Sequence, residues 1–329
     1  MAFESQFDTV VLYHKNCLDG LAAAWVVWCA HEGKVDLAAV QYDNDFAERF
    51  GPNWEDLAGK NVICVDFAFN IQETKSLMGI AKLLVLDHHA SAWKDLESIA
   101  WNDFTKGFEQ WHSRPDDYTN SVVVVDSGYS GAMLAWMWFN PGIEPPQGIK
   151  FAEDYDLWKF RYPETKNWVA AAFSYEMTVE NFNKVIATPV DEMVVEGRAI
   201  QRHIEKTVKG LSRSQRRFQL DEYDVPIVNA NSLFRNELGA ILSANEPFSL
   251  TYSDSRNGRQ YSLRSKKGTG VDVSVLAKRF GGGGHANSAA FSISMDDEQF
   301  HHSHVSLSST CLVKVDNSWE KVPRYKEKE

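Results

Sequence analysis

The chain has 329 residues, of which 44% are hydrophobic and 12% aromatic. These values are typical of a globular protein large enough for two domain cores, and they argue against an intrinsically disordered chain. The longest apolar stretch, residues 21–30, is about half as long as a bilayer span requires, and no charged-then-apolar leader precedes it. We therefore expect a soluble, cytoplasmic protein with no membrane partner. The four cysteines form no CxxC pair, which argues against a disulfide framework and a zinc knuckle.

The net charge of −11 is spread unevenly along the chain. Acidic residues crowd the first half, whereas residues 256–279 contain seven basic residues and one acid, Asp272. This basic segment could bind phosphates, and a solvated basic face is the alternative. Metal cations held by the acidic half would reduce its repulsion of an anionic substrate.

Apolar runs that alternate with helical spacing predict an α/β fold for the first half of the chain. The predicted strands are residues 9–13, 35–42, 61–66 and 82–86, with a helix from Leu21 and another over 71–81. Such alternation is typical of a parallel sheet with right-handed crossovers.

The regular pattern fails over residues 100–120, where aromatic residues are scattered among polar ones. We interpret this segment as an insertion or flap over the sheet, from which Trp111 could stack on a nucleic-acid base. A fifth strand at 122–126 and an apolar helix at 133–139 follow, and prolines end that helix.

The second half predicts a smaller α/β domain joined to the first by a helical linker. A long helix over residues 191–212 has the character of a spacer. We then expect a strand at 225–229, a helix at 237–244, a hairpin of 248–252 and 260–264 around the Asn257-Gly258 turn, a helix at 273–280 and a strand at 291–294. The predicted regions are a catalytic domain (1–185), a linker (186–220), a substrate-binding domain (221–300) and a frayed tail (301–329).

Residues that can hold a metal follow three of the predicted strands where each strand ends. His14 and Asp19 follow the first strand, Asp66 closes the third, and Asp87 and His88 follow the fourth. Because the carboxyl ends of parallel strands meet at one edge of a sheet, we expect these side chains to lie together. Each residue alone has an ordinary explanation, such as a helix cap, a turn or a buried histidine.

An acidic turn at residues 153–158 would complete this set with Asp154 or Asp156. A site rich in oxygen ligands with a minority of histidines suits Mn²⁺ or Mg²⁺ better than Zn²⁺. Two metals sharing Asp66 would favour hydrolysis of a phosphoester or phosphoanhydride.

The glycine run 281–284, followed by His285, is a second specific signal. A glycine backbone can approach a ligand closely with its N–H groups exposed, which suits the capture of a phosphate or carboxylate. A flexible turn is the alternative.

Taken in order, these motifs resemble the DHH phosphoesterase superfamily, with the distal part similar to its GGGH-type associated domain. The resemblance covers nearly the whole chain and is carried by 14–20, Val65-Asp66-Phe67, Asp87-His88-His89, Ser130-Gly131-Ala132, 153–158 and 282–291. It implies a manganese-dependent phosphodiesterase or phosphohydrolase in which the two domains close over a cleft.

The resemblance also implies roles for individual residues. Asp87 would orient the two histidines, and His89 would contact the scissile phosphate or its leaving oxygen. The implied metal ligands are His14, Asp19, Asp66, His88 and Asp154, and the implied contacts to a terminal phosphate or sugar are Arg264, Gly283, Gly284 and His285.

Cys17 stands where the superfamily usually has its first Asp. Thiolate is a softer ligand than Mn²⁺ prefers, so Cys17 as a ligand would weaken the first metal or favour Fe²⁺ or Zn²⁺. Asn16 as the ligand, with Cys17 an inert buried thiol, is the alternative.

The sequence therefore predicts a hydrolase that cleaves phosphodiester bonds of short oligonucleotides or (cyclic) nucleotides, with metal-activated water and Mn²⁺ as cofactor. The alternatives are a pyrophosphatase or polyphosphatase, and a catalytically weakened nucleotide-binding protein. The sequence points to no obligate protein partner, and a homodimer is compatible with it.

Overall fold

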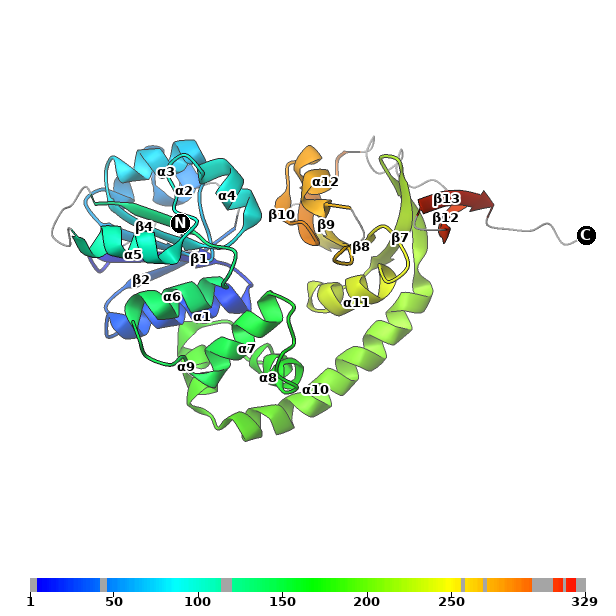
Figure 1. The fold of residues 1–329 in the computed structure, drawn as a ribbon, viewed down its shortest axis with the longest axis horizontal. Coiled ribbons are helices and arrows are strands. Elements are labelled where there is room, and N and C mark those ends of the chain that lie inside the picture. Colours follow the sequence, from blue (N-terminus) through cyan, green and yellow to red (C-terminus); the bar gives the residue numbers. More distant parts are fainter. Residues whose placement is uncertain are drawn as a thin grey trace, which may run out of the picture. The chain divides into compact units, whose positions relative to one another are not determined.

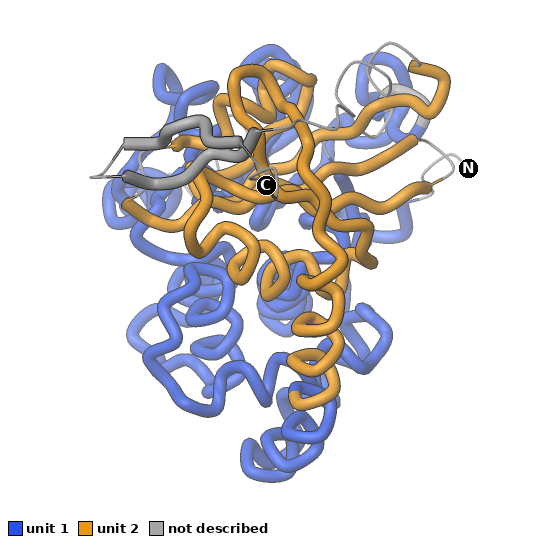
Figure 2. Tube along the Cα trace, turned by 90° about the vertical axis from the view of Figure 1, so that its right-hand side faces the viewer, with its two compact units in different colours: residues 1–201 blue, residues 202–329 orange. Residues whose placement is uncertain are grey.

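The computed structural model describes residues 5–41, 46–113, 120–255, 258–268, 271–297, 310–315 and 318–323. The chain forms two compact units, residues 1–201 and 202–329 (Figure 2). No helix in the described ranges is both long and apolar enough to cross a membrane.

The first unit is built on a five-stranded, fully parallel sheet, as the sequence predicts. Its strands lie in the order β2-β1-β3-β4-β5. Their bounds are Thr9–His14 (β1), Asp36–Val40 (β2), Asn61–Val65 (β3), Lys82–Asp87 (β4) and Val122–Val125 (β5). The strands that end in candidate ligands, β1, β3 and β4, are therefore neighbours at the centre of the sheet.

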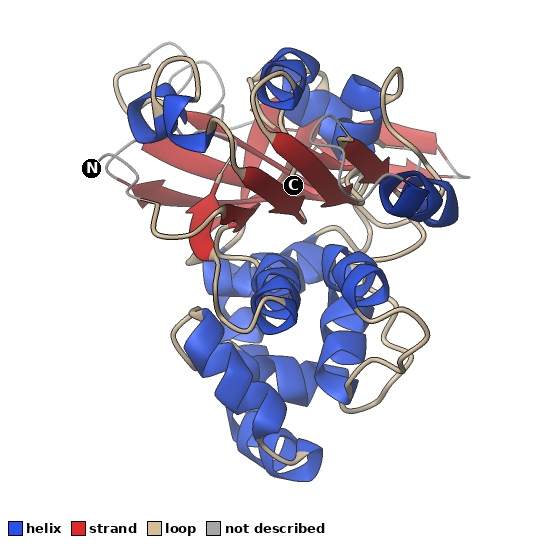
Figure 3. Cartoon of the chain, turned by 90° about the vertical axis from the view of Figure 1, so that its left-hand side faces the viewer, coloured by secondary structure: helices blue, strands red, loops and turns tan. Residues whose placement is uncertain are grey.

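Helices cover both faces of this sheet (Figures 1 and 3). Successive residues of one strand point to opposite faces, so Ile63 and Val65 join one apolar cluster while Val62 and Cys64 join the other. The helices are α1 (Leu18–Ala30), α2 (Phe46–Phe50), α3 (Ile71–Met78), α4 (Ala90–Leu96), α5 (Phe104–Ser113), α6 (Gly131–Phe139), α7 (Gln147–Asp156), α8 (Thr165–Ala172), α9 (Val179–Ala187) and α10 (Val190–Leu211), with a 3₁₀ turn at Glu55–Leu57.

Local sequence signals explain where several of these helices begin. Asn70 and Glu73 form a capping box at the start of α3. The Ser130 side chain accepts a hydrogen bond from the Met133 amide and caps α6. The apolar faces of α1 and α6 then pack against one side of the sheet, and α7 packs on these two helices.

The prediction of a flap over residues 100–120 is wrong, because α5 is packed into the core. At Gly107 an added Cβ would lie 2.3 Å from Val124 Cγ2, so α5 rests directly on β5. The Trp111 ring lies 6.1 Å from the Trp138 ring and beneath the Lys82 ammonium, which removes the base-stacking role suggested for it. Residues 114–119 lie outside the described ranges.

The long helix α10 confirms the helix predicted over residues 191–212. Its first turns belong to the first unit, since Met193 and Val194 are buried in that unit's core. At Gly197 an added Cβ would lie 1.7 Å from the backbone oxygen of Asn167 in α8. The close packing of α10 on α8 therefore requires glycine at this position.

The second unit contains a six-stranded mixed sheet in the order β10-β11-β9-β8-β7-β6. Neighbouring strands are antiparallel except for the β7–β8 pair. The bounds are Arg216–Leu220 (β6), Tyr223–Asn229 (β7), Ser249–Ser255 (β8), Gly258–Arg264 (β9), Gly283–His285 (β10) and Ser288–Ile293 (β11), with α11 (Arg235–Leu242), α12 (Val273–Arg279) and 3₁₀ turns at Ser212–Ser214 and Ser232–Phe234. The predicted hairpin is present as β8 and β9, although Asn257 itself lies outside the described residues.

The predicted frayed tail also contains regular structure. Strands β12 (Thr310–Val315) and β13 (Ser318–Pro323) pair antiparallel. The expectation of an unstructured end is therefore wrong for these two segments.

Two glycines in α10 provide a matched test of helix packing. We expect Gly197→Ala to lower the free energy of unfolding by roughly 1–3 kcal/mol, because the new methyl group meets fixed backbone atoms. At Gly210 an added methyl group would meet no atom within 4 Å, and alanine favours a helix more than glycine does. We therefore expect Gly210→Ala to raise the free energy of unfolding by up to about 1 kcal/mol. Urea unfolding followed by circular dichroism measures both, and shifts of the same sign would contradict this packing.

Candidate metal centre

The carboxyl edge of the sheet brings three predicted residues together. His14 ends β1, Asp66 follows β3 and His88 follows β4. The His88 Nε2 atom lies 3.1 Å from Asp66 Oδ1, and the His14 Nδ1 atom lies 3.6 Å from Asp66 Oδ2. Asp66 therefore stands between two imidazoles, and it has a left-handed backbone with φ of 53°.

Two helices add further carboxylates to this edge. Asp19 is in the first turn of α1, and Asp156 is the last residue of α7. Their Oδ2 atoms lie 3.8 Å and 3.5 Å from His88 Nε2. One imidazole nitrogen is thus close to three carboxylates, counting that of Asp66.

Cys17 also belongs to the cluster. It is the residue before α1, and its side chain caps no helix amide. One ligand atom each from His14, Cys17 and Asp66 lies within 4.8 Å of the others. Burial, followed by the neighbouring carboxylates of Asp66, Asp156 and Asp19, raises the pKa of the Cys17 thiol well above its usual value, so the neutral thiol is favoured.

The second histidine is held by the preceding acid. Asp87 Oδ1 accepts hydrogen bonds from the His88 amide at 2.8 Å and from His89 Nδ1 at 2.7 Å. This contact fixes the orientation of the His89 ring, which is the arrangement that the resemblance implies. The role of either residue in a reaction remains a prediction.

The charge of this cluster fits a divalent cation. Within the described residues, the carboxylates of Asp19, Asp66, Asp87 and Asp156 form ion pairs with histidines alone. The Asp87 Oδ2 and Asp156 Oδ2 atoms are buried and accept no hydrogen bond from the described part of the chain. Buried carboxylates without cationic partners are costly, and metal coordination is a usual way to satisfy them.

The pKa values of the cluster show the same excess of negative charge. Burial lowers the pKa of His88, but Asp66, Asp156 and Asp19 outweigh it and raise that pKa to about 10. Burial, reinforced by Asp66 and Asp156, raises the pKa of Asp19 well above its usual value. Burial opposes ionisation of Asp66, but the nearby His14 imidazole, the hydrogen bond with His88 and the charges of His88 and His89 bring its pKa well below the usual value.

Two glycines allow helices to approach Asp66, and this feature was not anticipated from the sequence. At Gly131 an added Cβ would lie 2.6 Å from Asp66 Cβ, and at Gly20 it would lie 2.5 Å from the His14 carbonyl oxygen. The Gly131 and Ala132 amides donate hydrogen bonds of 2.6 and 3.1 Å to the Asp19 carboxylate. The start of α6 thus positions Asp19, and the sequence signal for it is the Ser130-Gly131-Ala132 motif.

Asp154 does not join the cluster, which corrects the ligand carried over from the resemblance. Its carboxylate accepts hydrogen bonds from the Arg161 amide (2.9 Å), the Tyr162 amide (3.3 Å) and the Thr165 hydroxyl (2.6 Å). Successive residues of a helix are rotated by about 100°, so residues two apart lie on nearly opposite faces. Asp154 therefore faces the turn after α7, while Asp156 faces His88. Of the two alternatives, the geometry favours Asp156.

The candidate substrate contacts lie on β9 and β10, the two strands that flank β11 in the sheet of the second unit. Arg264 ends β9 and donates hydrogen bonds to Asn236 Oδ1 and to the Leu263 carbonyl. Gly283, Gly284 and His285 form β10, which pairs with β11. A Cβ at Gly284 would lie 2.5 Å from the Ser288 oxygen, so strand packing explains this glycine, whereas Gly281 lies in the turn before β10.

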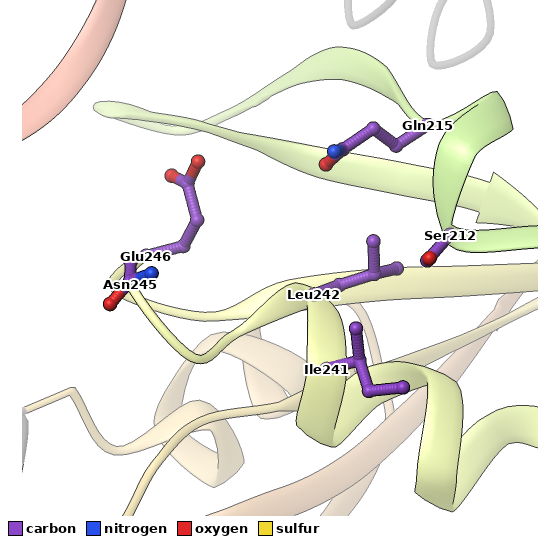
Figure 4. A pocket seen from close by; sticks show the side chains of 6 residues that line it. All are labelled: Ser212, Gln215, Ile241, Leu242, Asn245 and Glu246. Atoms are coloured by element: carbon purple, nitrogen blue, oxygen red, sulfur yellow. The ribbon is translucent and has the colours of Figure 1, made fainter. Parts of the chain in front are cut away.

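The most evident pockets lie elsewhere. One of about 220 Å³ in the second unit is lined by both polar and apolar side chains (Figure 4), and another of about 510 Å³ lies against α7 and α10 in the first unit. None of the predicted site residues lines either pocket. The residues around the first are Ser212, Gln215, Ile241, Leu242, Asn245 and Glu246.

Known proteins resemble the chain in sequence and in fold. No family model matches the chain. The chain is 25% identical to oligoribonuclease NrnB of Bacillus subtilis over 307 residues, which cover 86% of this chain and 72% of NrnB. A solved DHH domain, described as belonging to a member of a family of ribosomal proteins, has the same fold with a TM-score of 0.54, at 14% identity over 90% of this chain and 84% of that one. The chain therefore has the fold of a DHH domain, in agreement with the resemblance to the DHH phosphoesterase superfamily.

These similarities support a hydrolase of phosphoester bonds and leave its substrate open. An uncharacterized protein of Acanthamoeba polyphaga mimivirus is also 25% identical, over 303 residues, or 87% of this chain and 67% of the viral protein. Both sequence similarities extend through most of the two units.

The two acids of α7 can be separated by matched substitutions. We expect Asp156→Asn to weaken Mn²⁺ binding by at least about tenfold with little change in stability, because it removes a negative charge next to His88. Asp154→Asn should instead destabilise the protein by about 1–3 kcal/mol, because it weakens the bonds to the 161–165 segment. Isothermal titration with Mn²⁺ and thermal unfolding measure the two effects. If Asp154→Asn weakened Mn²⁺ binding and Asp156→Asn only lowered stability, Asp154 would be the ligand instead.

An added methyl group at Gly131, at the start of α6, should also disturb the metal centre. We expect Gly131→Ala to weaken Mn²⁺ binding, because the added carbon displaces the Asp66 backbone or the Asp19 carboxylate. Gly128→Ala is the control on the same loop, where the added carbon would meet only the Asp126 side chain. Equal Mn²⁺ affinity in the two variants would show that Gly131 does not shape the centre.

Proposed function

We propose that the protein is a metal-dependent phosphodiesterase that cleaves short oligonucleotides or (cyclic) nucleotides. The observation that carries the proposal is the buried cluster around Asp66, where four carboxylates are matched by histidines alone within the described residues. Excess negative charge of this kind suits two cations and an anionic substrate. The similarity to NrnB, named an oligoribonuclease, favours a nucleotide substrate over pyrophosphate.

The proposed ligands fall into two groups that share the Asp66 carboxylate. Divalent ions, with Mn²⁺ as our first choice because oxygen ligands dominate, would activate a water molecule and neutralise the phosphate oxygens. His14, Cys17 and Asp66 form one group. Asp66 Oδ1 lies beside His88, which with Asp19 and Asp156 forms the other.

The remaining residues orient groups and move protons. Asp87 holds His89 through its Nδ1 atom, and we propose that His89 hydrogen-bonds the scissile phosphate or protonates the leaving oxygen. Asp19 is fixed by the α6 amides and cannot swing away from His88. In the second unit, we propose that Arg264, Gly283, Gly284 and His285 bind a terminal phosphate or the sugar.

The first test is hydrolysis of a substrate panel with Mn²⁺ and with EDTA. The panel holds an RNA dinucleotide, a DNA pentamer, a cyclic dinucleotide, a cyclic mononucleotide and pyrophosphate. We expect Mn²⁺-dependent cleavage of at least one nucleotide. We also expect Asp66→Asn to lower turnover by at least about 100-fold, since losing even an outer partner of a metal ligand costs about 10–100-fold.

The exposed Asp191→Asn serves as the control for loss of an acid and should keep full activity. Cleavage of pyrophosphate alone would replace the proposal with a pyrophosphatase. Nucleotide binding without any cleavage would replace it with a nucleotide-binding protein.

Cys17 allows a second test of whether the centre is intact. If Cys17 is a native part of the centre, Cys17→Asp should leave Mn²⁺-dependent turnover unchanged or lower it. A gain of more than about tenfold would show that the thiol has weakened an ancestral two-metal site. Steady-state kinetics on the best substrate of the panel distinguishes the two outcomes.

A further inference from the structure

The turn that follows α7 presents a large aromatic ring next to the metal centre. Asp156 ends α7 beside His88, and Trp158 follows two residues later. Trp158 is 43% exposed, which is high for a tryptophan. Its ring is held edge-on by Phe160 at 4.7 Å and Tyr155 at 5.6 Å, measured between ring centroids.

The backbone of this turn is held in an unfavourable conformation. Trp158 and Phe160 have φ of 54° and 47°, in the left-handed region that bulky residues rarely adopt. The buried residue Asp154 maintains it: its carbonyl accepts a hydrogen bond of 2.9 Å from the Lys159 amide, and its carboxylate accepts one from the Arg161 amide. Strain that is maintained by surrounding contacts is typical of functional sites.

The same kind of strain marks the other loops of the metal centre. Among the described residues other than glycine, seven have positive φ. Four of these seven lie in the loops that carry the cluster or in the turn after α7. They are Asn16, Asp66, Trp158 and Phe160. The turn after α7 is therefore strained in the same way as the loops that supply candidate ligands.

Exposed cationic side chains lie close to Trp158 in the sequence. Lys159, Arg161 and Lys166 are exposed, and the Lys166 ammonium lies 4.8 Å from the centre of the Phe160 ring. Arg161 pairs with Glu153 and Asp154, which holds its guanidinium at the turn. An exposed aromatic ring among basic residues is the usual combination for binding a nucleotide by stacking and phosphate attraction.

We propose that Trp158 stacks on a base of the substrate adjacent to the scissile phosphate. This inference rests on the proposed function, since it places the base of a nucleotide next to the metal centre. Two residues of chain span at most about 7 Å between their Cα atoms, so the backbone of Trp158 lies within about one nucleotide of the backbone of Asp156, whose carboxylate is beside His88. Stacking tolerates every base, which predicts a substrate class of nucleotides without strict sequence preference, purines being favoured over pyrimidines.

The test compares Trp158→Ala and Trp158→Phe on two substrates, the RNA dinucleotide pApA and the same diester lacking both bases. We expect Trp158→Ala to raise KM for pApA by about 5- to 150-fold, as loss of one stacked base does elsewhere, and to leave the abasic diester unaffected. Trp158→Phe should retain most of the affinity. Trp101→Ala removes another exposed indole of the same unit and should change neither substrate.

An equal loss on both substrates would show that Trp158 only supports the fold of the turn, and no loss on pApA would remove it from the site. Either result would overturn the inference while the proposed function stands. If the unsubstituted protein cleaves nothing in the panel, the proposed function fails, and equilibrium dialysis of pApA tests the inference alone. Weaker binding to Trp158→Ala than to the unsubstituted protein would then support it, and equal binding would overturn it.

Discussion

A buried negative charge at the centre of the first unit governs how the surrounding elements must be arranged. Asp66 closes the middle strand of the sheet, is almost fully buried and has a left-handed backbone. Removing a carboxylate from water is costly unless positive charge or hydrogen-bond donors replace the water. His14 from β1 and His88 after β4 supply them, which is geometrically feasible because both strands are hydrogen-bonded to β3.

The helices must then come unusually close to this carboxylate. Gly20 and Gly131 lie at the starts of α1 and α6, where any side chain would collide with His14 or Asp66. Because these glycines have no side chain, the first amides of α6 can reach the Asp19 carboxylate. The partial positive charge at the N-terminus of α6 therefore faces the acidic cluster. The parallel sheet, the two glycines and the two histidines thus act as one unit around Asp66.

Much of this arrangement could be predicted from the sequence, because it depends on where apolar runs end. Parallel strands place their last residues at one edge, so His14, Asp66 and His88 were expected together and are together. The choice between Asp154 and Asp156 could not be made, since it depends on the rotation of α7, which is set by packing against α8. Helix α5 was missed although Phe104, Phe108 and Trp111 have helical spacing, because polar residues around them obscured the pattern.

Strand β6 escaped prediction for a related reason. It lies in the segment 186–220, which is predicted as a helical linker, and the structure places its Arg217 in ion pairs with Asp224 and Glu246. A charged residue can be recognised as part of a strand only when its partners are known, and Glu246 is 29 residues away in the sequence.

The hydrogen bonds around Asp154 have a consequence for the entropy of binding. A loop that is disordered before its ligand arrives loses backbone freedom on binding, and that loss weakens affinity. Asp154, Thr165 and the amides of residues 159–162 already hold the turn after α7 in the folded protein. The conformational entropy of the turn is therefore lost during folding, when the core of the first unit can compensate for it, and a ligand of Asp156 or Trp158 meets a surface that is already ordered.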